Sequence, residues 1–336
     1  MRLRQIPYTH GFPPEPHKNF TDFQILKKAQ VFEVEKMRTI QLMPAAFNMN
    51  NKKTGREVMF NAERFNLIPN EQAGSRKNHR SILTALNKVL CIDIVRARRI
   101  PTVIVFNDAK SCYDRIVLWI AAISLRRLGV TKGATLEMLK TLQTASHKIC
   151  TSYGDSEIAY EANRNTPLQG VGQGNGTGPA IWVAISSVLL TIMRTKGFGF
   201  SILSALSWHA LVISAFTFVD DTGIIHAAAD PHTDPLQVLS EAQQAVNTWE
   251  GILRATGGAI GADNDTKAFW YFLDFTFVGK KWEYKFLDQL QGQLLIRNYD
   301  GRNLPITRLE PKEARETLGI MIAMDGNQVA QFNCLR

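Results

Sequence analysis

The sequence predicts an α+β fold, with helices and strands mixed along the chain. At 336 residues and 45% hydrophobic content, the chain is long enough to bury a core and to divide into two or three subdomains. Apolar β-favouring runs such as TVIVFN (102–107) predict buried strands, and apolar residues at helical spacing predict helices at 81–99 and 235–255. These observations support a sheet combined with helices.

The first third of the chain is expected to contain loops, two strands and a helix. Residues 1–30 are expected to be rich in loops. KMRTIQLM (36–43) alternates as a strand does, 81–99 forms a helix that ends before Pro101, and 102–107 is a strand that carries Asp108 at its end.

Further helices and turns are expected in the second half of the chain. Helices are expected at 115–128 and 136–147, followed by a hairpin in KICTSYGDSEIAYEA with Gly154-Asp155 at its turn. A glycine-rich loop leads to Pro179, which suits the first turn of a helix that continues to Arg194. Strands then flank Asp220 and Asp221, and a strand-rich tail ends the sequence.

Positive charge is concentrated in the first 100 residues. They hold 18 Lys and Arg against 8 Asp and Glu, whereas the rest of the chain holds 21 against 22. The run GSRKNHRS supplies Arg76, Lys77 and Arg80, which suit contact with a nucleic-acid backbone. A solvated helix face is the alternative explanation of the same charges.

Cysteine usage indicates a reducing compartment, and the amino terminus predicts no signal peptide. The four cysteines are far apart and form no CxxC pair, so neither a disulfide framework nor a zinc site is expected. The first residues contain no apolar segment of the kind a signal peptide needs. Phe198–Val219 has the length of a membrane span, but its serines, His209 and β-favouring patches favour two buried strands and no membrane association.

Two adjacent carboxylates, Asp220 and Asp221, end an apolar run in AFTFVDDTGIIHAA. Like charges at this separation resist joint ionisation unless a cation compensates them. Asp108 at the end of the 102–107 strand could join them at one edge of a sheet, where carboxylates would suit Mg²⁺ or Mn²⁺. A solvated hairpin tip is the alternative for the pair alone.

Three segments together resemble the fingers and palm of a reverse transcriptase encoded by a retrotransposon. VFNDAKSCYDRI is similar to the first palm motif, with Asp108 as metal ligand and Tyr113 as steric gate. GVGQGNGTGPAIW resembles the loop that holds the template base and the incoming nucleotide, through Gln173 and Gly174, although Gly178 replaces the usual Ser. FVDD resembles the aromatic-x-Asp-Asp hairpin.

Weaker matches extend the resemblance from about residue 36 to 326. KMRTIQLM is similar to the fingers strand whose Arg contacts the triphosphate, which assigns that role to Arg38, with Lys36 as a helper. NEQAGSRKNHRS resembles the segment that follows this strand in retrotransposon enzymes. Lys267 occupies the place of a lysine near the pyrophosphate, and RETLGIMIA resembles the primer-grip hairpin.

The resemblance implies a right-hand polymerase fold with basic fingers and a palm of antiparallel sheet backed by helices. Its expected parts are fingers at 1–100, palm at 101–147, a fingers/palm hairpin at 148–168, palm at 169–275 and a strand-rich tail at 276–336. Only 17 residues follow Gly319, so a thumb is expected to be absent or truncated.

The implied activity is RNA-directed DNA polymerisation, a nucleotidyl transfer. A primer 3′-OH would attack a dNTP at a site of Asp108, Asp220, Asp221 and two Mg²⁺ or Mn²⁺, while Lys267 faces the pyrophosphate. Tyr113 would leave no room for a 2′-OH. The expected partners are an RNA template, a DNA or RNA primer, dNTPs and further domains of a retrotransposon polyprotein. The resemblance also implies an intracellular protein, in the nucleus or the cytoplasm.

Three alternatives stay open. The chain is an inactive nucleic-acid-binding remnant if the missing thumb abolishes synthesis. It is an RNA polymerase if Asp114, six residues after Asp108, holds a ribose 2′-OH, although Tyr113 favours a structural role for Asp114. It is a membrane protein if Phe198–Val219 forms a span.

Overall fold

The computed structural model describes residues 5–27, 29–34, 37–163, 165–204, 206–261, 268–297 and 301–336. The chain forms two compact units, each built from two separate stretches of sequence. The first unit comprises 1–68 and 111–185, and the second comprises 69–110 and 186–336.

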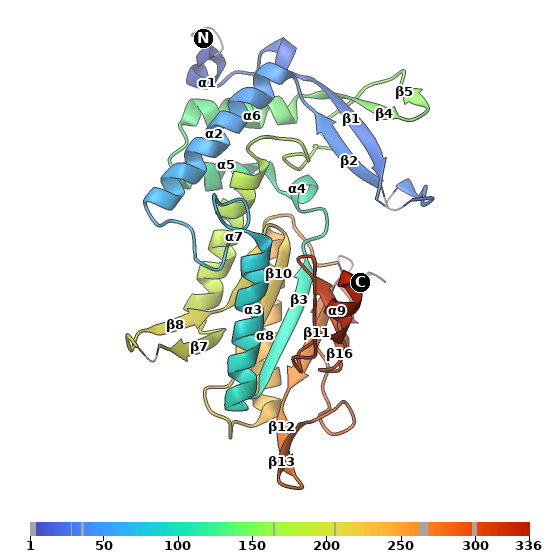
Figure 1. The fold of residues 1–336 in the computed structure, drawn as a ribbon. Helices are drawn as coiled ribbons and strands as arrows, with labels where there is room; N and C mark the ends of the chain where they lie inside the picture. Colours follow the sequence, from blue (N-terminus) through green and yellow to red (C-terminus); the bar gives the residue numbers. More distant parts are fainter. Residues whose placement is uncertain are drawn as a thin grey trace. The chain divides into compact units, whose positions relative to one another are not determined.

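The first unit combines a small sheet with helices (Figure 1). Strand order is β2-β1-β4-β5, with β6 also paired to β4; β1 is antiparallel to β2 and parallel to β4. Its elements are α1 (Ile6–His10), η2 (Glu15–His17), β1 (Asn19–Leu26), β2 (Met37–Leu42), α2 (Ala45–Arg64), α4 (Cys112–Arg115), α5 (Leu118–Arg127), α6 (Lys132–Gln143), β4 (Ser146–Thr151), β5 (Gly154–Asp155), β6 (Tyr160–Glu161) and the first part of α7 (Gly178–Thr195).

Helix α2 buries one face, although the sequence did not reveal it as a helix. Its buried residues recur every three or four positions: Phe47, Asn51, Gly55, Val58 and Ala62. Asn51 and Gly55 interrupt the apolar pattern. Gly55 is required by a close approach, because a Cβ there would lie 2.9 Å from the Gly176 carbonyl oxygen.

The second unit is built on a five-stranded sheet of order β16-β11-β3-β10-β9. Neighbouring strands are antiparallel, except β11 and β16, which are parallel. Its elements are α3 (Ser81–Arg98), β3 (Thr102–Asp108), the rest of α7, β7 (Phe200–Leu203), β8 (Ala210–Ile213), β9 (Ala215–Phe218), β10 (Asp221–Ala227), α8 (Pro235–Ala255), β11 (Phe269–Leu273), β12 (Phe275–Val278), β13 (Lys281–Tyr284), β14 (Leu295–Arg297), β15 (Asn303–Pro305), β16 (Thr307–Leu309), β17 (Arg315–Thr317), β18 (Ile320–Ile322) and α9 (Val329–Leu335).

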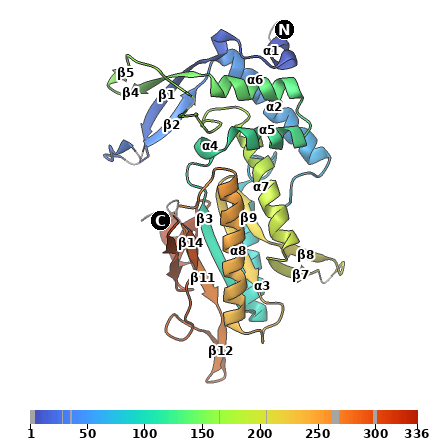
Figure 2. The same ribbon diagram turned by 180° about the vertical axis from the view of Figure 1, so that it is seen from behind.

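Helices cover both faces of this sheet, which explains the continuous apolar runs in its central strands. Figure 1 shows α3 in front of the strands, and Figure 2, the view from behind, shows α8 in front of them. In β3 only the terminal Asp108 is not fully buried, and all five residues of β11 are buried. The core of this unit therefore lies between the sheet and the two helices.

Most of the predicted elements are confirmed, with differences in detail. Strand β3, helices α3 and α8 and the hairpin of β17 and β18 lie where the sequence predicted them. Strand β1 was missed within the stretch expected to be loops. The turn in the 148–162 hairpin lies at 152–153, because Gly154 and Asp155 already pair with β4. The two units also divide differently from the expected subdomains, since α3 belongs to the sheet unit and the glycine-rich loop to the first unit.

One helix among the described residues, α7, is long and apolar enough to span a membrane by length and composition, and about two-thirds of it is buried within the protein. The stretch 198–219, considered from sequence, instead contains β7, β8 and β9. Strand β9 is buried as expected, but β7 and β8 are largely exposed, so the expectation of two buried strands was wrong for that hairpin.

Candidate active site

The sheet places two of the predicted carboxylates directly opposite one another. Asp108 is the last residue of β3, Asp221 is the first of β10, and the two are partners in the antiparallel register. Directly paired residues in antiparallel strands project to the same face. The Ala109 amide donates to the Asp220 carbonyl at 3.4 Å, which ties the strand end to the neighbouring hairpin.

Asp220 lies in a two-residue turn. Phe218 pairs with Asp221, so that only Val219 and Asp220 connect β9 to β10. Val219 has φ of 58°, in the left-handed region, where a β-branched residue costs about 1–3 kcal/mol. Surrounding structure must therefore hold the turn in this conformation.

The carboxylates of this site repel one another electrostatically. Burial raises the pKa of Asp220 to about 6, and repulsion by Asp108 and a hydrogen bond between the two carboxyls act in the same direction. Among the described residues, no group of three or more His, Cys, Asp or Glu side chains is arranged to hold a metal ion. A close pair of carboxylates still fits Mg²⁺, which takes one or two protein carboxylates and completes its shell with water and phosphate oxygens.

A pocket of about 590 Å³ lies in the second unit beside Asp108 and Asp221. Its other wall is the β17–β18 hairpin, whose turn residues Leu318 and Gly319 both have positive φ, as a two-residue hairpin turn requires. This hairpin contains the segment RETLGIMIA, whose sequence resembles a primer grip. The pocket thus has carboxylates on one side and a backbone turn on the other.

Lys88 also lines this pocket, and sequence reasoning did not single it out. It is 2% exposed, donates from Nζ to Thr317 Oγ1 at 2.9 Å, and lies over the Phe106 ring at 5.1 Å. Burial lowers its pKa to about 8, and the charge of Asp221 partly opposes that shift. Its position among the buried residues of α3, four after Thr84 and four before Ile92, was the available signal.

In the first unit, the glycine-rich loop binds the edge of β2. The Gln41 amide donates to the Gln173 carbonyl at 2.7 Å. Gly174 has φ of 121°, and a Cβ there would lie 2.4 Å from the Gln41 carbonyl oxygen, so this position requires glycine. The same strand carries Arg38, whose residue is exposed and pairs with Ile25 of β1.

Helix α2 holds the loop from its other side, through residues that the sequence did not reveal. Asn48 Nδ2 donates to the Gly174 carbonyl at 2.9 Å, and the Gly176 amide donates to Asn48 Oδ1 at 2.8 Å. The Thr177 hydroxyl donates to the Asn51 carbonyl at 2.7 Å. These asparagines could be found only once 45–64 was known to be a helix.

In the first unit, Tyr113 and Gln173 contact residues of the same two segments, the α4 region and the glycine-rich loop. Gln173 Nε2 donates to Asp114 Oδ2 at 3.1 Å, and burial raises the pKa of Asp114 while this bond opposes the rise. The Tyr113 carbonyl accepts from the Val171 amide at 2.8 Å. The Tyr113 ring lies 3.4 Å from the point where a Cβ on Gly178 would stand, which is ordinary contact distance.

The remaining predicted residues have different surroundings. Arg76 Nη1 donates to the carbonyls of Pro69 and Gln72. This nitrogen therefore stabilises the backbone of the segment 69–76, to which Arg76 itself belongs. Lys77 and Arg80 are exposed. Lys267 lies outside the described residues, as does Lys36.

No protein-family model matches the chain, and no curated protein sequence matches it. Among solved structures, it is similar to an apo telomerase from Candida tropicalis truncated from its C-terminal domain, with 12% identity and a TM-score of 0.49 over 81% of this chain and 56% of that one. It is also similar to a telomerase from Candida albicans in complex with a fragment of telomeric RNA, with 13% identity and a TM-score of 0.48 over 74% of this chain and 42% of that one. The matched region spans about half the length of each telomerase chain.

Proposed function

We propose that this chain is the fingers and palm core of a reverse transcriptase of retrotransposon type, which adds dNTPs to a primer 3′-OH on an RNA template. The observation that carries the proposal is the register of Asp221 opposite Asp108, with Asp220 in the turn between β9 and β10 and hydrogen bonded to Asp108. Carboxylates this close stay ionised together only where a cation neutralises them.

The residues of the second unit would have different roles in nucleotidyl transfer. Mg²⁺ or Mn²⁺, held chiefly by Asp108 and Asp220 with Asp221 beside them, would activate the attacking hydroxyl and neutralise the leaving pyrophosphate. The β17–β18 hairpin would orient the primer end in the pocket next to Asp108 and Asp221. Lys267 is proposed to face the pyrophosphate.

The first-unit residues would select the nucleotide. Tyr113 would occlude the 2′ position of the sugar, Gln173 would contact the template base or the incoming nucleotide, and Arg38 would bind triphosphate oxygens through its planar fork of donors. The backbone of the glycine-rich loop at Gly174 would allow close approach of the substrate. In the second unit, Lys77 and Arg80 would contact the nucleic-acid backbone.

Primer extension tests the proposal directly. The purified chain is given an RNA template, a DNA primer, dNTPs and Mg²⁺ or Mn²⁺, and compared with Asp220→Asn. The surface change Asp288→Asn, an exposed carboxylate of the same unit, is the matched control. We expect metal-dependent extension that Asp220→Asn abolishes and Asp288→Asn preserves, with nucleic-acid binding retained in both variants. Extension that survives Asp220→Asn would contradict the proposed metal site.

An inactive nucleic-acid-binding remnant is the second candidate. It is favoured by the lack of a three-carboxylate metal group among the described residues and by glycine at position 178. The same assay separates the two functions. Binding of primer and template that weakens with salt, without any extension, would establish the remnant.

A further inference from the structure

The segment from Pro69 to Arg76 lies along the outer edge of β9, the strand that leads into the Asp220 turn. Thr217 of β9 donates from its amide to the Glu71 carbonyl at 3.0 Å, and the Ala73 amide donates to the Thr217 carbonyl at 2.9 Å. Gln72 and Thr217 form a parallel bridge. The segment thus acts as a short additional strand beside the hairpin.

Gln72 fixes this segment from within. Its side chain is fully buried, donates from Nε2 to Ser186 Oγ on α7 at 2.6 Å, and accepts from the Gly74 amide at Oε1 at 2.9 Å. One side chain therefore joins the segment to the helix and also fixes the backbone at Gly74.

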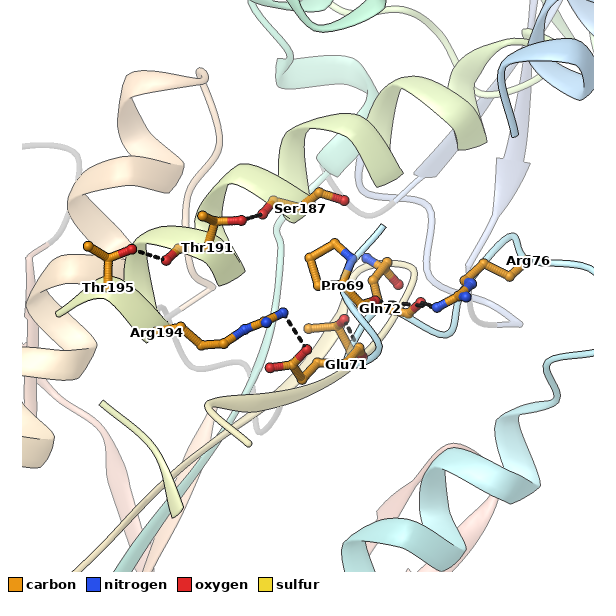
Figure 3. A network of polar contacts seen from close by, with 9 residues as sticks. Pro69, Glu71, Gln72, Arg76, Ser187, Thr191, Arg194 and Thr195 are labelled. Atoms are coloured by element: carbon orange, nitrogen blue, oxygen red, sulfur yellow. Dashed lines mark hydrogen bonds and ion pairs between the residues drawn. The ribbon is translucent and has the colours of Figure 1, made fainter. Parts of the chain in front are cut away.

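Two charged residues complete the support. Arg194 of α7 donates to Glu71 Oε2 at 2.8 Å, as Figure 3 shows. Arg76 bonds the carbonyls of Pro69 and Gln72 at 3.3 and 3.1 Å, which folds the segment back on itself (Figure 3). The segment is consequently held by hydrogen bonds at both ends and in the middle.

Gly74 is the point at which the segment meets the turn. A Cβ built on Gly74 would lie 2.0 Å from the Val219 amide nitrogen and 2.8 Å from its Cα. These are backbone atoms, so a side chain at position 74 can be accommodated only if the turn or the segment itself moves. Val219 is the residue held in the left-handed conformation immediately before Asp220.

We infer that Gly74 and Gln72 are positioning residues that set the conformation of Val219 and thereby the place of Asp220 and Asp221. The catalytic consequence rests on the proposed function. The structural part stands on the contacts of the loop with β9 and the turn, and it can be measured without activity.

Hydrogen exchange of the amides at 215–221 is the primary test. In Gly74→Ala we expect these amides to exchange at least about tenfold faster, while those of β3 and β11 keep the exchange rates of the unchanged protein. Gly251→Ala is the matched control, because Gly251 lies in α8 and a Cβ there would meet nothing within 4 Å. It should leave exchange of the hairpin unchanged.

Gln72→Met is the second variant, in case Gly74→Ala does not fold. It keeps the approximate length of the side chain but removes both of its hydrogen bonds, so the same amides should exchange faster. Unchanged exchange at 215–221 in a folded variant would overturn the inference. Equal acceleration across the whole unit would also overturn it, because that result describes a purely structural role.

Primer extension gives the catalytic readout. A displacement of the turn near 1 Å should lower kcat by about 100-fold in Gly74→Ala and leave the Kd for primer and template within about threefold. If the unchanged protein does not extend a primer, the proposed function fails while the exchange comparison still decides the positioning role. An active protein whose Gly74→Ala variant has accelerated exchange but unaltered kcat would overturn the catalytic part.

Discussion

Lys88 and Thr317 are joined by a hydrogen bond of 2.9 Å between Nζ and Oγ1, although 229 residues separate them in the chain. The bond links helix α3 to the β17–β18 hairpin. Lys88 is also buried against Phe106 of β3, and its ammonium group interacts electrostatically with Asp221 of β10. The same side chain therefore contacts both the strands that carry the carboxylates and the hairpin. The position of the hairpin relative to Asp108 and Asp221 therefore depends on this side chain.

Replacing Lys88 by Met should separate stability from activity. Met fills similar space without a buried charge, so the thermal midpoint should stay the same or rise by a few degrees. Loss of the bond to Thr317 should lower kcat/KM for primer extension about tenfold, which corresponds to about 1.4 kcal/mol. Calorimetry and steady-state kinetics check the pair of effects, with the exposed Lys281→Met as control. Parallel loss of stability and activity would contradict this role.

Tyr113→Ala should relax the choice of sugar. The Tyr113 backbone bond to Val171 does not need the ring, so the loop should keep its conformation. We expect the rNTP-to-dNTP ratio of kcat/KM to rise at least about tenfold, because the ring no longer occludes the 2′-OH. Tyr153→Ala, at a 94% exposed residue of the same unit, is the control. An unchanged ratio would show that another residue makes the choice.

Asp114 should act through Gln173 rather than on the sugar. Asp114→Asn retains an acceptor for the Gln173 amide and should change KM for dNTP by less than about threefold. Asp114→Leu leaves that amide unpaired and should raise KM about tenfold, with the rNTP-to-dNTP ratio unaltered. A fall in rNTP use would instead support the RNA-polymerase alternative, in which Asp114 contacts the 2′-OH.

Glu137 should make stability depend on pH. It is fully buried, with Oε1 3.0 Å from His17 Nδ1, and burial raises its pKa to about 8. Between pH 6.5 and 8 the folded protein holds a proton on Glu137 that the unfolded chain has lost, so stability falls as pH rises, by at most about 1.4 kcal/mol per pH unit. Burial lowers the pKa of His17, so its contribution to the pH dependence has the opposite sign and lies mainly below about pH 7.

Glu137→Gln should remove most of that fall. The thermal midpoint, measured at pH 6.5 and 8, should decrease less in this variant than in the unchanged protein. Glu57→Gln, an exposed glutamate in the same unit, should retain the full decrease. Identical decreases in all three proteins would show that Glu137 is ionised throughout the window.

The sequence predicted those elements whose burial follows a simple pattern, either wholly buried or buried along one face. Strand β3 is almost wholly buried and α8 is strongly amphipathic, so their patterns are clear. Strand β1 was missed because its buried residues include Asp22, which pairs with His147 at 3.1 Å. A charged residue at a core position is intelligible only when its partner, 125 residues away, is known.

The candidate site was predictable in kind but not in its supports. FVDD and the end of β3 predicted carboxylates at one edge of a sheet, and the register pairs Asp108 with Asp221. The contributions of Lys88 and Asn48 depend on long-range partners, so nothing adjacent in sequence indicates them. Arg76 had a charge that suggested phosphate contact, whereas its bonds to the Pro69 and Gln72 carbonyls support the segment to which it belongs.

The loop beside β9 has a consequence for solubility as well as for geometry. An edge strand with unpaired backbone groups is a template on which a second molecule can add a strand. Because Glu71 and Ala73 already bond both backbone groups of Thr217, that position is closed to such pairing. Loosening of the loop would thus expose an adhesive edge, and the chain would then be prone to self-association at the strand that carries its turn.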